Sequence, residues 1–394
     1  MTTTIKNEQK KLNVPNIRFP EFSGEWKEET LGSVAKVVGG GTPDTNIQKY
    51  WNGNIQWFTP SEIGRDKYVT YSLRTISEEG LNKSSAKILP TGTILLSSRA
   101  TVGECSINNV ECTTNQGFQS LIAKENISNE FLFYLIQTKR KELIRKSCGS
   151  TFLEISANEV RKIKIAIPTH KEQEKIGKLL ALLDKRIATQ TKIIEDLKKL
   201  KCAIIEKLYS KIQGKEYSFG QLFEVVNERN KQMKYSNILS ASQEKGMVNR
   251  DDLNLDIQFE RSNINTYKIV RAGDYVIHLR SFQGGFAFSD KLGVCSPAYT
   301  ILRPKEVLEY GYLSYFFMSR QFIKSLVLVT YGIRDGRSIN VEEWLGMKTM
   351  LPSKEEQRKI LNVLCCFDEK IQNEENMLNK LSKQKQYLLR QMFI

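Results

Sequence analysis

The sequence predicts an α+β protein in which two pseudo-repeated α/β domains are joined by two long antiparallel coiled-coil helices. Three observations lead to this prediction: a phrase that occurs twice, a heptad pattern after each copy, and a fainter repeat before each copy. The phrase reads IPTHKEQEKI at residues 167–176 and LPSKEEQRKI at residues 351–360. Such an internal repeat is considered before any other fold assignment, because it divides the chain into equivalent parts.

The match between the two copies continues well beyond the phrase. With Pro168 set against Pro352, it runs without a gap as far as Tyr209 and Phe393, and eleven of the aligned pairs are identical. Each proline closes a strand-like run, KIKIAI in the first copy and MKTML in the second. Because proline cannot extend such a strand, a new element is expected to start directly after it.

The residues after each proline carry the signals of a helix N-terminus. Thr169 and Ser353 can cap the helix, and Glu172 and Glu356, three residues later, complete a capping-box pattern. We therefore expect a long helix to begin at this point in both copies.

Past the caps, apolar residues step by four and three over about five heptads, which is typical of a coiled-coil seam. Two polar positions interrupt both seams at equivalent places, Gln190 with Glu374 and Lys201 with Lys385, which suggests that the helices pack on each other. An antiparallel pair is favoured because the chain must travel out and back; ordinary amphipathic helices on a core are the alternative. The predicted seam and subunit-docking residues are Ile176, Leu180, Leu183, Ile187, Ile194 and Leu197, and Ile360, Leu364, Phe367, Ile371, Leu378 and Leu381.

The segments before the two helices repeat more faintly and predict two domains, or heads, with one plan. Each head should have a short helix, short and mostly antiparallel strands, an aromatic helix, a polar loop and a final strand. The matched pairs are LGSVAKVV with FGQLFEVV, ILPTGTILLSSR with IVRAGDYVIHLR, FLFYLIQT with YLSYFFMS, and ISANEV with INVEEW. The expected boundaries are a tail at 1–16, a first head at 17–168, a helix at 169–213, a second head at 214–352 and a helix at 353–394.

The polar loops of the two heads differ most, and the net charge of +15 with a pI near 9.3 favours a polyanionic partner. Arginine can bridge guanine and glutamine can pair with adenine, so these loops predict contacts to double-stranded DNA. The residues concerned are Ser98, Arg99, Thr101, Ser150 and Thr151 in the first head, and Arg280, Ser281, Gln283, Tyr331, Arg334 and Arg337 in the second. Trp51, Trp57 and Phe58 could stack on bases, but core packing is favoured for them.

The sequence shows no motif for catalysis, metal binding or membrane insertion. It has no phosphate-binding G-x-x-x-x-G-K-[ST] loop, and His170 and His278 lack ligand-spaced partners. The seven cysteines form no C-x-x-C pair and are expected to be core thiols. With no signal-like apolar segment and no long apolar run, the chain is expected to be cytoplasmic and away from membranes.

Two unlike heads, each followed by a helix that opens with P-x-x-x-E-Q-x-K-I, resemble the specificity subunit of a type I restriction–modification enzyme. The segment IRFPEFSGEWKEETLGSVAKV at 17–37 is also similar to the usual start of that family. The resemblance implies that each head is a target recognition domain for one half of an asymmetric, split DNA site. It also implies that the helices set the spacing and dock two modification subunits.

The same resemblance implies how cofactors are distributed. The modification subunits would carry S-adenosylmethionine and methylate adenine, two restriction subunits would use ATP and Mg, and this non-catalytic chain would bind no cofactor. Two alternatives stay open on the sequence. One is a coiled-coil scaffold whose heads bind proteins, and the other is a stand-alone restriction or modification enzyme with a degenerate active site.

Overall fold

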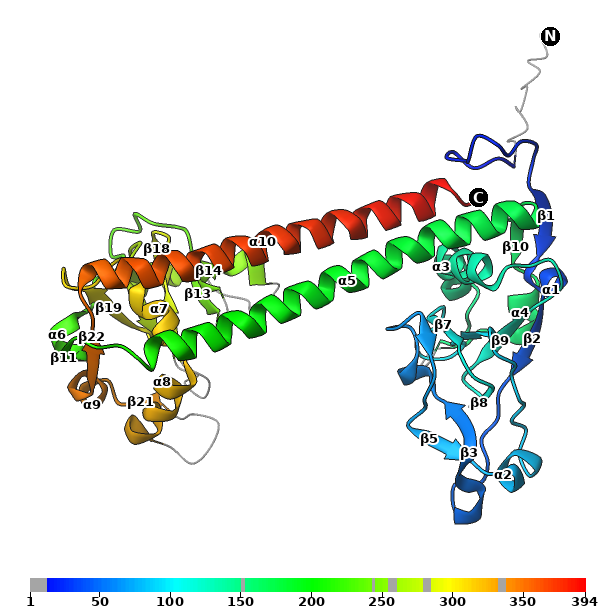
Figure 1. Ribbon diagram of the computed structural model, residues 1–394, viewed down its shortest axis with the longest axis horizontal. Coiled ribbons are helices and arrows are strands. Elements are labelled where there is room, and N and C mark those ends of the chain that lie inside the picture. Colours follow the sequence, from blue (N-terminus) through cyan, green and yellow to red (C-terminus); the bar gives the residue numbers. More distant parts are fainter. Residues whose placement is uncertain (1–12, 150–152, 243–244, 254–260, 279–284, 332–337) are drawn as a thin grey trace, which may run out of the picture. The chain divides into compact units, whose positions relative to one another are not determined.

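Two long helices follow the repeated phrases: α5 spans His170–Tyr209 and α10 spans Lys354–Gln391 (Figure 1). The computed structural model describes residues 13–149, 153–242, 245–253, 261–278, 285–331 and 338–394. The chain divides into two compact units: unit 1 contains residues 1–190 and 377–394, and unit 2 contains residues 191–376. Each unit therefore holds one head together with a part of both long helices.

The head of unit 1 combines small β-sheets with short helices. A five-stranded sheet has the order β2-β9-β6-β7-β4, a second sheet has the order β5-β3-β8, and β1 pairs with β10. Neighbouring strands are antiparallel except for the parallel pairs β3–β8 and β4–β7. The elements are β1 (Lys27–Thr30), α1 (Leu31–Val34), β2 (Ala35–Gly39), β3 (Trp51–Phe58), β4 (Tyr68–Val69), β5 (Arg74–Ile76), α2 (Glu78–Asn82), β6 (Ile94–Leu96), β7 (Cys105–Asn108), β8 (Cys112–Thr114), β9 (Gln119–Ala123), α3 (Asn129–Arg145), α4 (Ala157–Arg161) and β10 (Lys164–Ile167).

The head of unit 2 repeats this plan. Its largest sheet has the order β12-β19-β16-β17, which matches β2-β9-β6-β7 strand for strand, and β11 pairs with β22 as β1 pairs with β10. The shared plan predicted for the two heads is therefore confirmed. The elements are β11 (Lys215–Ser218), α6 (Phe219–Leu222), β12 (Phe223–Val226), β13 (Leu239–Ser242), β14 (Gly246–Asn249), β15 (Lys268–Val270), β16 (Tyr275–Ile277), β17 (Phe286–Phe288), β18 (Gly293–Cys295), β19 (Thr300–Pro304), α7 (Tyr312–Phe316), α8 (Arg320–Ser325), β20 (Thr330–Tyr331), β21 (Ser338–Ile339), α9 (Val341–Gly346) and β22 (Lys348–Leu351).

The aromatic helix is where the two heads differ in secondary structure. In unit 1 it is the continuous helix α3, whereas in unit 2 the matching segment is divided into α7 and α8. The division occurs at Ser319, whose buried hydroxyl accepts a hydrogen bond from the amide of Phe322 and so caps a new helix. Serine at this position favours a helix start over helix continuation.

In unit 1 the beginning of α5 packs against the end of α10. Ile176 and Leu180 share one hydrophobic core with Met392 and Phe393, and further along α5 the carboxylate of Asp184 meets Lys385 at 2.6 Å. Residues later in α5 therefore contact residues earlier in α10. The two segments are antiparallel within this unit, as the sequence predicts.

In unit 2 the end of α5 packs against the beginning of α10 in the same sense. Ile205 and Tyr209 share a core with Ile360 and Leu364. Lys198, about two turns before Ile205 on α5, pairs with Glu375 of α10 at 2.7 Å. The segments in this unit are therefore also antiparallel.

Lys385 is a predicted polar interruption of the seam, and it takes part in a three-residue contact in unit 1. Its ammonium group pairs with Asp184 and lies 5.7 Å from the ring centre of Tyr134. The Tyr134 hydroxyl donates to the same carboxylate at 2.6 Å. Burial and this hydrogen bond raise the pKa of Tyr134, so the phenol stays a donor at physiological pH.

The same contact recurs in unit 2 with the residues that the repeat makes equivalent. Lys201 pairs with Asp368 and lies 4.9 Å from the ring centre of Tyr315. The Tyr315 hydroxyl donates to Asp368 at 2.6 Å, and burial together with this bond raises the pKa of Tyr315. Each lysine thus joins one long helix to the other and to a head, because the tyrosine comes from α3 or α7.

Every predicted seam residue is buried or half-buried. Ile176 and Leu180 belong to the core of the first head, and Ile360 and Leu364 to the core of the second. The first turns of both helices therefore also pack one apolar face on the core of a head, as the alternative of amphipathic helices on a core requires. Because these side chains are enclosed, the prediction that they form the surface that docks other subunits needs correction: the exposed faces of the helices are the available surface.

The repeated glutamine of the phrase fixes each helix to its head. Gln173 is buried, and its amide donates to the carbonyl of Pro168 at 3.0 Å while its oxygen accepts from the amide of Ser128 at 3.0 Å. Gln357 makes the equivalent bonds, to the carbonyl of Pro352 at 3.0 Å and from the amide of Glu309 at 2.9 Å. One side chain thus satisfies backbone groups of the preceding proline and of the loop before the head helix.

The predicted capping boxes are only partly present. The hydroxyl of Ser353 accepts from the amide of Glu356 at 3.3 Å, as expected of a cap. The carboxylate of Glu172 instead accepts two hydrogen bonds from the guanidinium of Arg18, both at 2.8 Å. The prediction for Glu172 is therefore wrong, because a buried carboxylate is better compensated by a cation than by one backbone amide.

Replacing Gln357 by leucine should destabilise unit 2 by about 1–3 kcal/mol, because buried backbone groups lose their partners. Urea unfolding followed by circular dichroism measures the change. Gln372→Leu, on an exposed face of α10, is the matched control and should change the stability of the protein by less than about 0.5 kcal/mol. Equal effects of the two substitutions would contradict the assigned role of Gln357.

Candidate nucleic-acid interface

The turn that follows β6 lies where several loops of the first head meet. Ser98 donates its amide to the carbonyl of Gly117 at 2.8 Å, and its carbonyl accepts from the amide of Ile155 at 2.9 Å. The side chain of Ser98 is fully buried. Its hydroxyl is therefore placed in the interior and not on the loop surface where the sequence analysis expected it, because the backbone turns inward to make these two bonds.

Arg99 and Thr101 are the exposed members of the same turn. The Arg99 guanidinium donates to Glu154 Oε2 from Nε at 3.0 Å and from Nη2 at 2.6 Å. Between them, Ala100 adopts a left-handed conformation with φ of 62°, which is uncommon for a residue with a side chain. The turn is thus held in a specific shape that presents Arg99 outward beside the 148–154 loop.

The structure brings the two predicted loops of the first head together. Ala100 donates its amide to the carbonyl of Leu153 at 3.2 Å, and Cys148 and Glu154 exchange backbone hydrogen bonds at 2.9 and 3.0 Å. Ser150 and Thr151 lie outside the described residues. The turn at 97–104 therefore lies against Leu153 and Glu154, and Glu154 pairs with Cys148.

Sequence reasoning missed other groups of the first head. The Thr42 hydroxyl donates to the side-chain oxygen of Gln116. The next residue, Gly117, is the one whose carbonyl accepts from the amide of Ser98. Tyr71 and Leu73 lie between β4 and β5 and are 84% and 88% exposed. A large exposed apolar pair is unusual on a surface without a partner. The run VTYSLRTI, in which apolar residues occur between two very short strands, was the available signal.

The aromatic residues of β3 are structural. Trp51, Trp57 and Phe58 are buried, and the rings of the two tryptophans meet edge to face at 5.1 Å. The Arg74 guanidinium lies 3.5 Å from the Trp51 ring centre. Core packing, which the sequence analysis favoured over base stacking, is what the structure shows.

In the second head, the predicted residues follow β16 and β20. Arg280, Ser281, Gln283, Arg334 and Arg337 lie outside the described residues, and Tyr331 is described only as the end of β20. β16 pairs with β17, and β20 pairs with β21, so residues 279–284 and 332–337 connect paired strands. His278, at the end of β16, has its pKa lowered by burial and is therefore neutral at pH 7.

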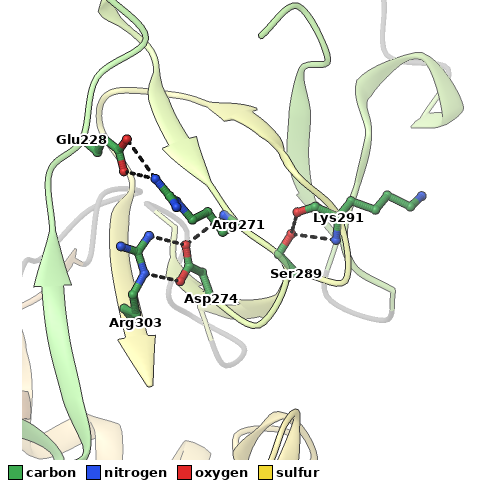
Figure 2. A network of polar contacts seen from close by, with 6 residues as sticks. All are labelled: Glu228, Arg271, Asp274, Ser289, Lys291 and Arg303. Carbon is green, nitrogen blue, oxygen red and sulfur yellow. Dashed lines mark hydrogen bonds and ion pairs between the residues drawn. The ribbon is translucent and has the colours of Figure 1, made fainter. Parts of the chain in front are cut away.

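A polar network fixes the start of β16 (Figure 2). Asp274, only 2% exposed, accepts from Nε and Nη2 of Arg303 at 3.1 and 3.2 Å and from the amide of Arg271 at 2.9 Å. Its carbonyl accepts from the amide of Ser289 at the end of the same hairpin. The Arg271 side chain turns outward to Glu228 at 3.0 Å. The network thus joins the start of β16 to the end of β17 and to β19.

In the part of the chain that the structure describes, no group of three or more histidine, cysteine, aspartate or glutamate side chains could hold a metal ion. No helix within those described ranges combines the length and the apolar character that a membrane span requires.

A repeated helical frame that carries two heads with unlike loops defines a two-headed binding protein. A family model described as type I restriction modification DNA specificity domain matches residues 23–199 and again residues 213–383. The chain therefore belongs to the family of type I restriction–modification DNA specificity domains. This family is that of specificity subunits, which are DNA-binding and non-catalytic.

Several curated proteins are similar to the chain. The MjaIX specificity subunit of Methanocaldococcus jannaschii is 37% identical over 180 residues, 45% of this chain and 42% of that protein. The EcoR124I/EcoR124II specificity subunit of Escherichia coli is 31% identical over 175 residues, 43% of each. Both alignments span less than half of the relatives. The MjaVIII specificity subunit of M. jannaschii is 24% identical over 412 residues, 95% of this chain and 92% of that protein.

Solved structures share the fold. The S subunit of a type I restriction–modification system from M. genitalium aligns with a TM-score of 0.56 and 14% identity, covering 97% of this chain and 99% of that one. A chain from a study of complex assembly in the type I system aligns with a TM-score of 0.62 and 14% identity, covering 94% and 97%. At this identity the likeness shows the fold, a mixed α/β chain.

Replacing Asp274 by alanine should destabilise unit 2 by about 3 kcal/mol, because Arg303 would be left half-buried without its carboxylate. The Arg271–Glu228 pair is exposed, so Glu228→Ala should cost less than about 1 kcal/mol. Thermal and urea unfolding of both variants measure the difference. A smaller cost for Asp274→Ala than for Glu228→Ala would show that the network does not anchor the hairpin.

Proposed function

We propose that this chain is the DNA-sequence-specificity subunit of a type I restriction–modification complex. Each head would read one half of an asymmetric, bipartite DNA site, and the two long helices would set the spacing between the halves. The observation that carries the proposal is the contrast between a repeated frame and unrepeated loops. The sheet order, the buried glutamine and the lysine–aspartate–tyrosine contact recur in both units, whereas the residues at the loops do not.

The contrast has a physical reason if the two heads face different base sequences. The sheets and the long helices must hold each head in the same way, so their residues are constrained in both copies. The loops that contact bases are free to differ. Dimeric DNA readers use two-fold symmetry to meet two half-sites in this manner. Unlike loops on a pseudo-symmetric frame would therefore meet two unlike half-sites.

In the first head, Arg99 and Thr101 are the described candidates for DNA contact. The Arg99–Glu154 pair is exposed on both sides, and such pairs contribute only about 0–1 kcal/mol. A bidentate contact from arginine to guanine is worth about 1–3 kcal/mol of discrimination, so DNA can compete with Glu154 for the guanidinium. Ser150, Thr151, Arg280, Ser281, Gln283, Tyr331, Arg334 and Arg337 remain proposed contacts of the same kind.

The exposed faces of the long helices are proposed to dock two modification subunits. Two pairs of apolar residues occupy equivalent positions in the repeat and are exposed: Leu182 with Cys366, and Ile193 with Met377. Apolar side chains at matching exposed positions are what two copies of one partner would require. These partners would bring S-adenosylmethionine for adenine methylation, and two restriction subunits would bring ATP and Mg, in the cytoplasm.

A coiled-coil scaffold with protein-binding heads is the second candidate. Val327 and Leu328 in the second head are 73% and 74% exposed, and an apolar pair of this kind suits a protein surface. Salt dependence separates the two functions. If several phosphates are contacted, affinity of the assembled complex for duplex DNA should fall by orders of magnitude between about 50 and 200 mM salt. Negligible DNA affinity in the complex would favour the scaffold.

Arg99→Ala should relax base preference in one half-site by about 1–3 kcal/mol and leave the other half-site unchanged. The measurement is binding of the complex to duplexes with single base changes in each half. Arg161→Ala, an exposed arginine on α4, is the control. A uniform loss across all sequences would reassign Arg99 to phosphate binding, and no loss would remove it from the interface.

Ile193→Asp and Met377→Asp should each reduce the number of bound modification subunits from two to one, because a charge opposes burial of an apolar contact. Native mass spectrometry of the reconstituted complex gives the stoichiometry. Thr189→Asp and Asn379→Asp add the same charge at exposed positions of the same helices. Retention of two subunits in both test variants would argue against this docking face.

A further inference from the structure

In unit 1, a segment of the chain itself covers the junction between the start of α5 and the end of α10. Arg18 donates two hydrogen bonds, both at 2.8 Å, to the fully buried carboxylate of Glu172, and two more to the carbonyls of Ser23 and Gly24. The amide of Ile17 donates to the carbonyl of Gln391 at 3.0 Å, and Asn16 donates to the side chain of Gln391 at 3.0 Å. This segment, which turns at residues 19–22, is therefore held by both helices at once.

Apolar and cation–π contacts complete the fit of this segment. Ile17 and Phe19 pack against the core of unit 1. The ammonium group of Lys175 lies 4.5 Å from the ring centre of Phe19 and pairs with Glu21. The recognised pattern is thus an arginine directly followed by an aromatic residue, with its backbone bonded to the last turn of the opposite helix.

Unit 2 contains the equivalent junction, and there it is an open groove of about 580 Å³. The groove is lined mainly by apolar side chains of both helices and by a few charged ones, among them Ile204, Lys207, Leu208, Pro352, Glu356 and Ile360. Every one of these residues has a counterpart in the repeat. Glu356, Ile360 and Pro352 correspond to the identical residues Glu172, Ile176 and Pro168.

The two glutamates differ in what covers them. The side chain of Glu172 is 1% exposed beneath Arg18, whereas that of Glu356 is 54% exposed and lies 4.0 Å from Lys359. Lys359 is itself the counterpart of Lys175, which packs on Phe19 in unit 1. The recognition residues are therefore repeated in unit 2, but the segment that they recognise is not.

The chain cannot fill this groove in the way that it does in unit 1. In unit 2 the backbone passes directly from the end of α5 into β11, where Gly214 occupies the place that Trp26 has before β1. A Cβ atom at Gly214 would come within 2.0 Å of the carbonyl oxygen of Leu351. A ligand of the groove would therefore extend only over the part that corresponds to residues 16–21.

We propose that this groove in unit 2 binds a segment of another protein, in which an arginine is directly followed by an aromatic residue. The arginine would pair with Glu356, the aromatic ring would pack by Lys359, and a backbone amide would reach the last turn of α5. Lys207 stands where unit 1 has Gln391, so the bound segment would carry a carboxylate at the position of Asn16.

The lining of the groove favours this ligand over the other candidates. A polyanion such as DNA would meet the Glu356 carboxylate and an apolar wall, which disfavours it despite Lys207 and Lys211. A second copy of the chain has the matching segment, but there Arg18 is already paired with its own Glu172. A different protein with a free segment of this chemistry is the occupant that the contacts specify.

The test uses a fluorescent peptide with the sequence of residues 13–22, NVPNIRFPEF, and the full chain, with binding followed by anisotropy. We expect saturable binding that Glu356→Lys weakens at least about tenfold, since a charge-assisted bond is lost. Glu369→Lys makes the same charge change at an exposed position of α10, outside the groove, and should bind as the unaltered chain does. A peptide with Arg18→Ala should bind at least about tenfold more weakly, and one with Asn16→Asp more tightly.

Three results would overturn the proposal. The first is absence of binding, and the second is equal binding to the unaltered chain and to Glu356→Lys, which would place the peptide in unit 1. The third is dimerisation of the chain by itself that Glu356→Lys abolishes, because the occupant would then be a second copy. DNA binding by the assembled Glu356→Lys variant should be unchanged, which separates this surface from the recognition of DNA.

Discussion

A buried glutamine side chain joins each long helix to its head, and the rest of each unit is built around that connection. Gln173 and Gln357 each bond the proline that ends the last strand and the loop that precedes the head helix. An amide can do this because it donates and accepts at once. Neither a carboxylate nor an apolar residue could satisfy both backbone groups, so the repeated phrase keeps this residue type in both copies.

The glutamine sets the position of the head, and the lysine–aspartate–tyrosine contact then fixes how the head lies on both helices. In unit 1 the three residues come from α3, α5 and α10, so moving any one element would expose or separate charged groups. The strand order of the main sheet and the starting points of the long helices are the same in both units. The turn after β6 takes no part in the glutamine bonds or in this contact, so its residues can differ from those of the second head.

Much of the frame could be predicted from the sequence, because repetition and apolar spacing report on local geometry. The seam, the final strand of each head and the matching sheets all follow from such patterns. What could not be predicted depends on contacts between distant residues. The pairing of Arg18 with Glu172 and the burial of Ser98 depend on contacts with residues far away in the sequence, which no local pattern reveals.

The composition of the first core has a consequence for how the chain matures. Met392 and Phe393, which follow the whole second head along the chain, lie inside the core of unit 1 with Trp26 and Phe131. Residues 191–376, by contrast, are a single stretch that needs nothing from the C-terminal end. On the ribosome residues 191–376 can therefore close first, and the first head must wait, partly assembled, until residues 392 and 393 have been made.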